Sequence, residues 1–371
     1  MRPGATTMRG PPTIRAVRAR AYTVPTDAPE ADGTYAWDRT TLVVVHVEAG
    51  PETGLGYSYT EASVARLIET MLAPRLTGLS ALDIPQAGEV LWGAVRNVGR
   101  SGLAASAISA LDTALWDLKA RLLGLPLATL FGRARERAVI YGSGGFTAYD
   151  DRQLCAQLGA FVARDGCRAV KMKIGSEPER DPARMAAAKG AIGDATLFID
   201  ANGAFTPKRA LAMAREAEPF GVAWFEEPVT SDDPDGMAFV RAAAPAGMEI
   251  AAGEYAYTLD DLHCLIRAGA VDVAQADVTR CGGYSGFLKM AALCEAAHLD
   301  LSGHCAPALH LPVAVAVARF RHLEWFHDHV RIERMLFEGA PVPHEGAITP
   351  DLSRPGHGLT LKNRDADAYA V

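Results

Sequence analysis

The sequence has no apolar run that approaches the roughly 18 residues a membrane-spanning helix needs. Residues 1–22 are basic, but no apolar stretch of the kind found in a secretory signal follows them. Basic residues form no stripe interleaved with aromatic side chains, and the formal net charge is −7. We therefore expect neither a membrane nor a nucleic acid among the partners of this protein.

Cysteine is sparse and scattered. No two of the six cysteines have the close spacing of a metal site, and no dense cluster suggests disulfide bonds. Reduced thiols in the cytoplasm fit this pattern best. Most of the cysteines stand among apolar neighbours, as small core residues do, and only Cys305 lies beside a candidate functional residue, His304. The six are Cys155, Cys167, Cys264, Cys281, Cys294 and Cys305.

Glycine-rich phosphate loops are also missing, because no G-x-G-x-x-G or Walker-type motif follows a first strand, which weakens an interpretation as a doubly wound sheet. From about residue 137 onward a unit recurs, made of a short β-rich run, a loop and an alanine-rich segment of helical period. Eight runs alternating with seven helical segments predict a closed (β/α)7β TIM-like barrel of the α/β class rather than an open sheet. The runs are "AVIY", "AVKMKI", "LFID", "VAWFEE", "MEIAAGE", "VDVAQAD", "LDLSGH" and "HLEWF".

The part of the chain before about residue 135 has a different pattern. Strand-like "TLVVVHVEAG" is followed by helical segments such as "ASAISALDTALWDLKARLLGLP". Strands followed by helices predict a separate α+β domain over residues 1–135, ahead of a barrel over residues 136–340. The segment 341–371 is rich in Pro, Gly and Asp but contains the apolar "GLTL", so we expect it to fold back onto the first domain.

Almost every predicted barrel strand ends in an ionisable side chain. In such a barrel the carboxyl ends of the strands converge on one site, where isolated buried charges are costly unless they are paired or bound to a metal. Any one of these residues could simply be solvated at the start of a loop, but that explanation is poor for six consecutive strands. The six strands end, in order, in Lys171 and Lys173, Asp200, Glu226 with Glu227, Glu254, Asp277 and His304, and the eighth strand carries Glu324.

Three carboxylates on successive strands, Asp200, Glu226 and Glu254, would lie side by side at the barrel mouth. Without a cation they would repel one another. A ligand set made only of oxygen, without His or Cys, selects a hard cation. The sequence therefore predicts a Mg²⁺ site at these three residues.

Two further side chains are placed to move protons. Lys173 and His304 lie on strands that flank the three carboxylates, so they could face opposite sides of one substrate. Asp277, on the strand next to His304, could accept the Nδ1 proton and fix the imidazole tautomer. Such an arrangement suits removal of the proton next to a carboxylate, provided that Lys171 and low polarity depress the pKa of Lys173. The other histidines, such as His310, His327 and His329, lack comparable support and are predicted to be surface or core residues.

The motifs "VKMKIG", "DANG", "WFEEP", "AAGE", "QADVTRCGG" and "SGHCAP", in this order and spacing, resemble the mandelate racemase subgroup of the enolase superfamily (mandelate racemase/muconate lactonizing enzyme family). The resemblance covers nearly the whole chain. It implies Mg²⁺ held by the three carboxylates, with Lys173 as one base and His304 with Asp277 as the other. It further implies Lys171 near the substrate carboxylate, a protonated Glu324 as a donor to it, and Asn202 of "DANG" as a substrate contact.

The resemblance also implies that the first domain caps the barrel mouth, that its loops choose the substrate, and that the chain forms a homo-oligomer. Two departures limit what it implies. Arg280 stands where relatives with a lysine base on the sixth strand have Lys, and arginine stays protonated, which argues against muconate-cycloisomerase or dipeptide-epimerase chemistry. The segment "GLGYSY" replaces the usual Gly-Glu pattern of the cap, so pocket selectivity does not carry over.

Three functions remain open on the sequence. The favoured one is a Mg²⁺-dependent dehydration of an acid sugar, an aldonate or aldarate, to a 2-keto-3-deoxy acid, because most relatives with this pattern act on sugar acids. The second is racemisation or epimerisation of a 2-hydroxy acid by the same two bases. The third is a catalytically silent sugar-acid binding protein, which the presence of both bases makes a poorer interpretation.

Overall fold

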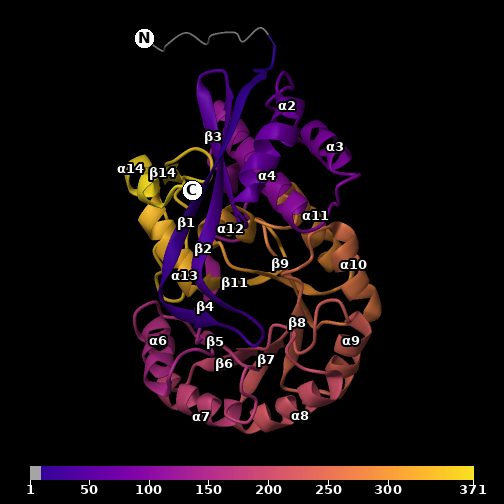
Figure 1. Ribbon diagram of the computed structural model, residues 1–371, viewed down its shortest axis with the longest axis vertical. Helices are drawn as coiled ribbons and strands as arrows, with labels where there is room; N and C mark the ends of the chain where they lie inside the picture. Colours follow the sequence, from indigo (N-terminus) through magenta and orange to yellow (C-terminus); the bar gives the residue numbers. More distant parts are fainter. Residues whose placement is uncertain (1–9) are drawn as a thin grey trace.

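The computed structural model describes residues 10–371 and has two parts, a cap and a barrel (Figure 1). The cap begins with a three-stranded antiparallel sheet in the order β1-β2-β3. Short and long helices follow, among them a π-helical segment at Ile68–Leu72. The strands are β1 (Ile14–Ala31), β2 (Ala36–Ala49) and β3 (Glu52–Tyr59), and the helices are α1 (Ser63–Leu67), α2 (Ala73–Leu76), α3 (Ile84–Ala94), α4 (Leu103–Leu123) and α5 (Leu127–Phe131).

The long helix α4 packs closely on β3, and the glycines of "GLG" explain how. A Cβ on Gly54 would lie 2.1 Å from the carbonyl oxygen of Ala114, and one on Gly56 would lie 2.3 Å from that of Ala110. Only a residue without a side chain lets the backbone of the strand approach the helix this closely. The unusual "GLGYSY" segment is thus partly a packing feature of the cap.

Eight parallel strands form the second part, and pairing of β11 with β4 closes them into a ring. This closure confirms the predicted barrel and excludes the doubly wound sheet, since an open sheet keeps two free edges. The strands are β4 (Ala138–Gly144), β5 (Ala169–Lys173), β6 (Thr196–Asp200), β7 (Val222–Glu226), β8 (Glu249–Ala252), β9 (Val273–Ala276), β10 (Asp300–Gly303) and β11 (Phe320–Phe326).

Seven helices connect the eight strands and surround them, and an eighth follows β11, as Figure 1 shows. The helices are α6 (Asp151–Ala163), α7 (Asp181–Ile192), α8 (Pro207–Ala217), α9 (Pro234–Ala243), α10 (Leu259–Ala268), α11 (Gly283–Ala296), α12 (Pro307–Ala314) and α13 (His327–Leu336). Two of them begin with a capping box that the sequence encodes, formed by Asp150 at α6 and by Thr258 at α10.

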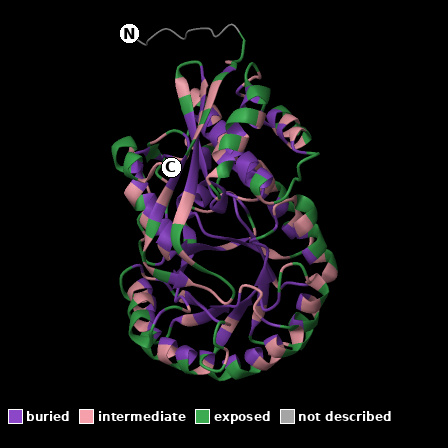
Figure 2. Cartoon of the chain, viewed as in Figure 1, coloured by how far each residue is buried: buried purple, intermediate pink, exposed green. Residues whose placement is uncertain are grey.

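Alternation along β5 separates two environments. Val170, Met172 and Ile174 belong to the hydrophobic core between strands and helices, whereas Lys171 and Lys173 are directed to the barrel interior. Beneath them an aromatic layer of Tyr141, Phe198 and Trp224 fills the barrel. Figure 2 shows the barrel strands as an almost continuous buried zone, and because both lysine side chains are buried, their charges need partners.

The C-terminal tail contacts both parts. β13 (Ala347–Ile348) adds an antiparallel strand to β4, and β14 (Thr360–Leu361) pairs with β12 (Phe337–Glu338), ahead of α14 (Asn363–Ala366). On the cap side, His357 N donates to Asp117 Oδ1 at 2.9 Å and Val371 N donates to Ala21 O at 3.1 Å.

The exact domain limits stay a prediction, and residues 1–9 of the predicted first domain lie outside the described residues. Within residues 10–371, no helix has the length and apolar character to cross a membrane.

Candidate active site

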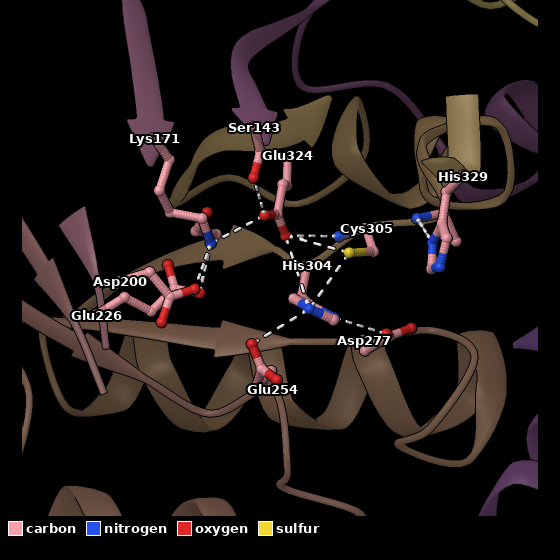
Figure 3. A network of polar contacts seen from close by, with 12 residues as sticks. Ser143, Lys171, Asp200, Glu226, Glu254, Asp277, His304, Cys305, Glu324 and His329 are labelled. Atoms are coloured by element: carbon pink, nitrogen blue, oxygen red, sulfur yellow. Dashed lines mark hydrogen bonds and ion pairs between the residues drawn. The ribbon is translucent and has the colours of Figure 1, made fainter. Parts of the chain in front are cut away.

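The three predicted carboxylates meet at the carboxyl end of the barrel (Figure 3). Asp200 and Glu226 end neighbouring strands and are direct register partners. Glu254 follows β8 and is preceded by Gly253, which has a φ of 134°. A Cβ on Gly253 would lie 2.2 Å from Gln275 O of β9, so glycine lets the chain pass close to that strand. Asp200, Glu226 and Glu254 each offer an oxygen atom, and these atoms all lie within 4.8 Å of one another.

This oxygen set fits a hard divalent cation. All three side chains are buried, and Glu254 Oε2 accepts no well-formed hydrogen bond although His304 Nε2 lies 3.2 Å away. Burial, followed by the charge of Asp200, raises the pKa of Glu226 to about 8. A cation bound here would relieve that repulsion and use the free oxygen of Glu254.

The two lysines of β5 have different positions. Lys171 is fully buried, with its Nζ bonded to Glu226, 2.8 Å from Glu324 Oε1 and 3.3 Å from Asp200 Oδ2. It does not line the cavity, and its ammonium group is shared by the three surrounding carboxylates. Lys173, two residues further along β5, lines the cavity. Its Nζ donates hydrogen bonds to Asp200 Oδ2 at 2.5 Å and to Asn202 Oδ1 at 3.0 Å.

The expectation of a depressed pKa for Lys173 is wrong for this arrangement. Burial lowers the pKa of Lys173, and Lys171 lowers it further, but the carboxylates of Asp200, Glu254 and Glu226 together raise it above the usual value. The sequence shows that Lys171 lies on the same strand as Lys173, but it does not show that Asp200 of the neighbouring strand forms an ion pair with Lys173. An ion pair at contact distance dominates a repulsion between two separated ammonium groups.

His304 and Asp277 form the predicted pair. His304 Nδ1 lies 2.8 Å from Asp277 Oδ2, and the other oxygen of Asp277 accepts from Thr279 N at 2.6 Å. The Nδ1 proton is thereby assigned to the bond with Asp277, which leaves Nε2 facing the cavity. Burial lowers the pKa of His304, but anionic neighbours such as Glu254 and the bond to Asp277 hold it well above the usual value.

Glu324 lies between the lysine and the histidine. Ser143 Oγ donates to its Oε1 at 2.6 Å, and Cys305 N donates to its Oε2 at 3.1 Å. Burial raises the pKa of Glu324, yet Lys171 and His304 outweigh burial and hold that pKa well below the usual value. Glu324 is therefore ionised here, which contradicts the protonated donor implied by the resemblance, because its partners are a lysine and hydrogen-bond donors rather than an apolar wall.

Above these residues lies a cavity of about 920 Å³, roofed by the cap. Its barrel side includes Lys173, Asn202, Glu254, His304 and Glu324, so these five predicted site residues share one space. Lys171, Asp200, Glu226 and Asp277 do not line the cavity. Lys171, Asp200 and Asp277 each pair with a residue of that set, and Glu226 pairs with Lys171.

The cap reaches this cavity with the hairpin between β1 and β2. Thr147 N donates to Ala31 O at 2.8 Å, and Thr147 Oγ1 donates to Asp32 O at 2.7 Å. A Cβ on Gly33 would lie 2.5 Å from the carbonyl oxygen of Ile174, so glycine lets the hairpin tip sit on the end of β5. The tip is therefore a fixed wall of the cavity.

Sequence reasoning missed the cap residues of this wall. Trp37 Nε1 donates to Glu30 Oε2 at 2.7 Å, while Glu30 Oε1 is buried without a partner. Burial, then the charge of Asp328, raises the pKa of Glu30 to about 8. Tyr59 of β3 stacks on His329 with 3.4 Å between ring centroids, which brings a predicted structural histidine to the cavity edge. No local motif signals the contacts with Asp328 and His329, since both join the cap to distant residues of the barrel.

Two family descriptions match the chain. Residues 16–132 match the mandelate racemase / muconate lactonizing enzyme N-terminal domain, and residues 153–366 match the enolase C-terminal domain-like family. Together they cover most of the cap and the barrel.

Two curated relatives are named for reactions of sugar acids. The 3,6-anhydro-alpha-L-galactonate cycloisomerase of Streptomyces coelicolor is 35% identical over 94% of this chain and 97% of its own length. The L-talarate/galactarate dehydratase of Salmonella typhimurium is 34% identical over 74% of this chain and 70% of its own length.

Solved structures share the fold. A mandelate racemase/muconate lactonizing enzyme-like protein from Rubrobacter xylanophilus has a TM-score of 0.95 and 49% identity, over 97% of this chain and 100% of that chain. A variant of the L-talarate/galactarate dehydratase with Mg and L-glucarate has a TM-score of 0.89 and 28% identity, over 100% of this chain and 96% of that chain.

Proposed function

The chain belongs to the mandelate racemase/muconate lactonizing enzyme family of the enolase superfamily, and we propose that it removes the proton next to the carboxylate of a sugar acid and expels the β-hydroxyl as water. The product would be a 2-keto-3-deoxy acid. The observation that carries this proposal is that Lys173 and His304 both face the cavity beside Glu254, one of three clustered carboxylates. A base and an acid that share one space are what a β-elimination requires.

The cofactor that fits is Mg²⁺, held by Asp200, Glu226 and Glu254. When bound, it would supply positive charge that stabilises the enediolate formed on loss of the α-proton. Lys171, paired with Glu226 and Glu324, keeps the floor of the site close to neutral. An incoming substrate carboxylate would therefore need the positive charge of the bound cation, since that of Lys171 is already shared by Glu226 and Glu324.

Proton transfer is divided between two residues. Lys173 takes the α-proton on Nζ once the charge of Asp200, the main cause of its raised pKa, is compensated. His304 has a raised pKa and carries the proton on Nε2, which it gives to the leaving β-hydroxyl as the C–O bond breaks. The electron pair of the broken C–H bond forms the enol, and protonation at C3 then gives the keto acid. Asp277 keeps the imidazole oriented throughout.

A second candidate follows from the name of the Streptomyces coelicolor relative. If the oxygen on C3 is part of a 3,6-anhydro ring, the same elimination opens the ring and the leaving oxygen stays attached, so the net reaction is an isomerisation. Both candidates use Lys173 and His304 in the same roles. A racemase or epimerase of a 2-hydroxy acid would instead return the proton to the same carbon.

The test uses the Mg²⁺-loaded protein in D₂O with a panel of aldonic, aldaric and 3,6-anhydro-aldonic acids. Keto acid that reacts with semicarbazide supports elimination, and NMR identifies water loss or ring opening. Deuterium uptake at the α-carbon without keto acid would instead establish racemisation. Ligand stabilisation without exchange or turnover would establish a silent binding protein and overturn the proposal.

Two variants assign the proton-transfer residues. Lys173→Ala and His304→Asn should each lower turnover by about 10²–10⁴-fold, as expected for loss of a general base or acid. Lys208→Ala and His344→Asn, at exposed positions outside the cavity, are the matched controls and should keep full activity. An active Lys173→Ala/His304→Asn double variant would refute the assignment.

The small-molecule substrate, the cytoplasmic location and the homo-oligomeric assembly stay predictions for this chain. Sedimentation equilibrium of the Mg²⁺-loaded protein measures the assembly directly.

A further inference from the structure

A second set of metal-ligand atoms lies beside the three carboxylates. It consists of Cys305 Sγ, His304 Nε2 and Glu324 Oε2, which all lie within 4.8 Å of one another. Figure 3 shows the three side chains directed toward a common point. The set combines sulfur, nitrogen and oxygen, in contrast to the oxygen-only set of Asp200, Glu226 and Glu254.

The spacing of the three atoms matches one face of a tetrahedral metal site. Sγ lies 3.3 Å from Nε2 and 3.3 Å from Oε2, and Nε2 lies 3.7 Å from Oε2. Tetrahedral Zn²⁺ with ordinary bond lengths to sulfur, nitrogen and oxygen places its ligand atoms about 3.3–3.6 Å apart. Only small side-chain rotations separate the observed positions from a ligating geometry.

Partners behind the ligands hold them in place. His304 uses Nδ1 for Asp277, the carboxylate–histidine arrangement that orients metal-binding imidazoles and leaves Nε2 for the metal. Glu324 uses Oε1 for Ser143 and Lys171, while its Oε2, which also accepts from Cys305 N, lies on the side of the cluster. Cys305 has a φ of 51°, a left-handed conformation rarely adopted outside glycine, which places its side chain beside that of its neighbour His304.

The cluster is accessible to an ion and chemically selective. Cys305, His304 and Glu324 all line the 920 Å³ cavity, so a cation and a water as fourth ligand can reach them. Burial and then Glu324 raise the pKa of the Cys305 thiol, so at neutral pH the sulfur keeps its proton until a cation arrives. A divalent cation displaces that proton to solvent and binds the thiolate, whereas Mg²⁺ prefers oxygen ligands.

We propose that Cys305, His304 and Glu324 form a binding site for a thiophilic divalent cation such as Zn²⁺ or Cd²⁺, separate from the three-carboxylate site, and that its occupation inhibits the enzyme. Inhibition follows from the ligand atoms: once Nε2 of His304 binds a metal, it neither carries nor receives a proton. The binding part of this proposal is independent of the substrate.

Co²⁺ is the probe, because a cobalt–thiolate bond absorbs in the near ultraviolet and cobalt bound to oxygen ligands does not. The protein is first saturated with Mg²⁺ and then titrated with Co²⁺. We expect one equivalent to develop the thiolate band in the wild type and in Cys264→Ser, which alters an exposed cysteine. Cys305→Ser should lose the band. No band in the wild type, or an undiminished band in Cys305→Ser, would overturn the proposal.

A second measurement does not depend on how well the variant folds. The ¹¹³Cd NMR shift of the wild type with Mg²⁺ and one equivalent of Cd²⁺ should report one sulfur ligand, and a shift for oxygen ligands alone would refute the site. With a turned-over substrate, Zn²⁺ should inhibit the wild type and Cys264→Ser alike. Cys305→Ser should need at least about tenfold more Zn²⁺ for the same inhibition. If Zn²⁺ inhibited Cys305→Ser and the wild type equally, the inhibition would not arise from this site.

Discussion

His304 and Lys173 both have a raised pKa, but through different neighbours. Among the groups that raise the pKa of Lys173, Asp200, a carboxylate of the proposed metal site, has the largest effect. His304 depends on the surrounding anions and on its hydrogen bond to Asp277. Asp277 is buried and does not line the cavity, so it acts on a substrate only through the imidazole. It is a positioning residue whose contribution can be measured separately.

Asp277→Asn should lower turnover of the identified substrate by about 10²–10⁴-fold, because the imidazole loses the partner that fixes its tautomer. The change also removes a negative charge beside His304, so the pKa of His304 falls. If protonated His304 is the acid, activity is lost as pH rises through that pKa. The alkaline limb of the pH–rate profile should therefore move to lower pH.

Asp194→Asn, at an exposed position far from the barrel mouth, is the control and should leave the profile unchanged. Asp277→Glu should move the alkaline limb part of the way back toward its wild-type pH, because it returns a carboxylate to this position. An unaltered alkaline limb in Asp277→Asn would contradict a role for His304 as the acid.

Residue identity at the strand ends could be predicted from sequence, whereas charge state could not. The strand runs place Asp200, Glu226 and Glu254 correctly because parallel strands in register bring their ends together. The protonation of Lys173 and Glu324 depends on contacts across strands, at distances that a linear pattern does not encode. Both of those expectations were therefore wrong in direction.

At the scale of elements, β3 and α4 are joined by a close contact that depends on glycine. Gly56→Ala should destabilise the cap by about 1–3 kcal/mol, because the added Cβ would overlap Ala110 O and force the helix away. Gly88→Ala is the matched control: nothing lies within 4 Å of its Cβ, and alanine favours α3, so its stability should not fall. Urea unfolding measures the free energy of unfolding of both variants. Equal values would show that α4 moves away from an added Cβ on Gly56 at no cost in stability.

The β1–β2 hairpin and its neighbours give the cap side of the cavity an acidic character. In the described part of the chain, the acidic and basic residues of this side are Glu30, Asp32, Asp38, Arg39 and Glu61. Arg39 is paired with Asp38, and Glu30, with a pKa raised to about 8, carries little charge at neutral pH. No unpaired cation in that set is available for a second carboxylate at the far end of a substrate.

If the proposed dehydration holds, aldonates should therefore be better substrates than the aldarates of the same configuration, by about tenfold or more in kcat/KM, since like charges at close range repel. Matched pairs such as gluconate and glucarate test this. Glu61→Lys should narrow the preference, whereas Glu69→Lys, which lies outside the cavity, should not. A preference for aldarates in the wild type would refute this interpretation.

Elements of the barrel were predictable because apolar runs, capping residues and helical periods are local. The way in which the cap meets the barrel was not. The contacts of Thr147 with the hairpin, of Tyr59 with His329 and of Gly33 with the end of β5 each join segments more than a hundred residues apart. Such contacts follow from the packed fold and leave no periodic signal in the sequence.

At the scale of the whole molecule, metal binding and stability should be coupled through pH. Burial and Asp200 raise the pKa of Glu226 to about 8, so a proton competes with the metal below that pH. The increase in the thermal-unfolding midpoint caused by a fixed Mg²⁺ concentration should therefore grow between about pH 6 and about pH 9.

Glu226→Gln should lose most of this Mg²⁺-dependent increase, while Glu338→Gln, at an exposed position, should keep it. Chelation with EDTA should return the wild type to its starting midpoint. A Mg²⁺ effect that does not vary with pH would place the ion elsewhere.

The tail has a consequence for how the protein is made. Chains emerge from the ribosome N-terminus first, so the cap strands exist long before the segment that holds them. His357 and Val371 supply contacts to Asp117 and Ala21 of the cap, and β13 completes the edge of β4. The roof of the cavity thus gains its last contacts only after the final residues are synthesised. A nascent chain stalled before residue 347 would carry every proposed catalytic side chain and the contacts of Thr147 with the hairpin, but not the contacts by which the tail supports the cap.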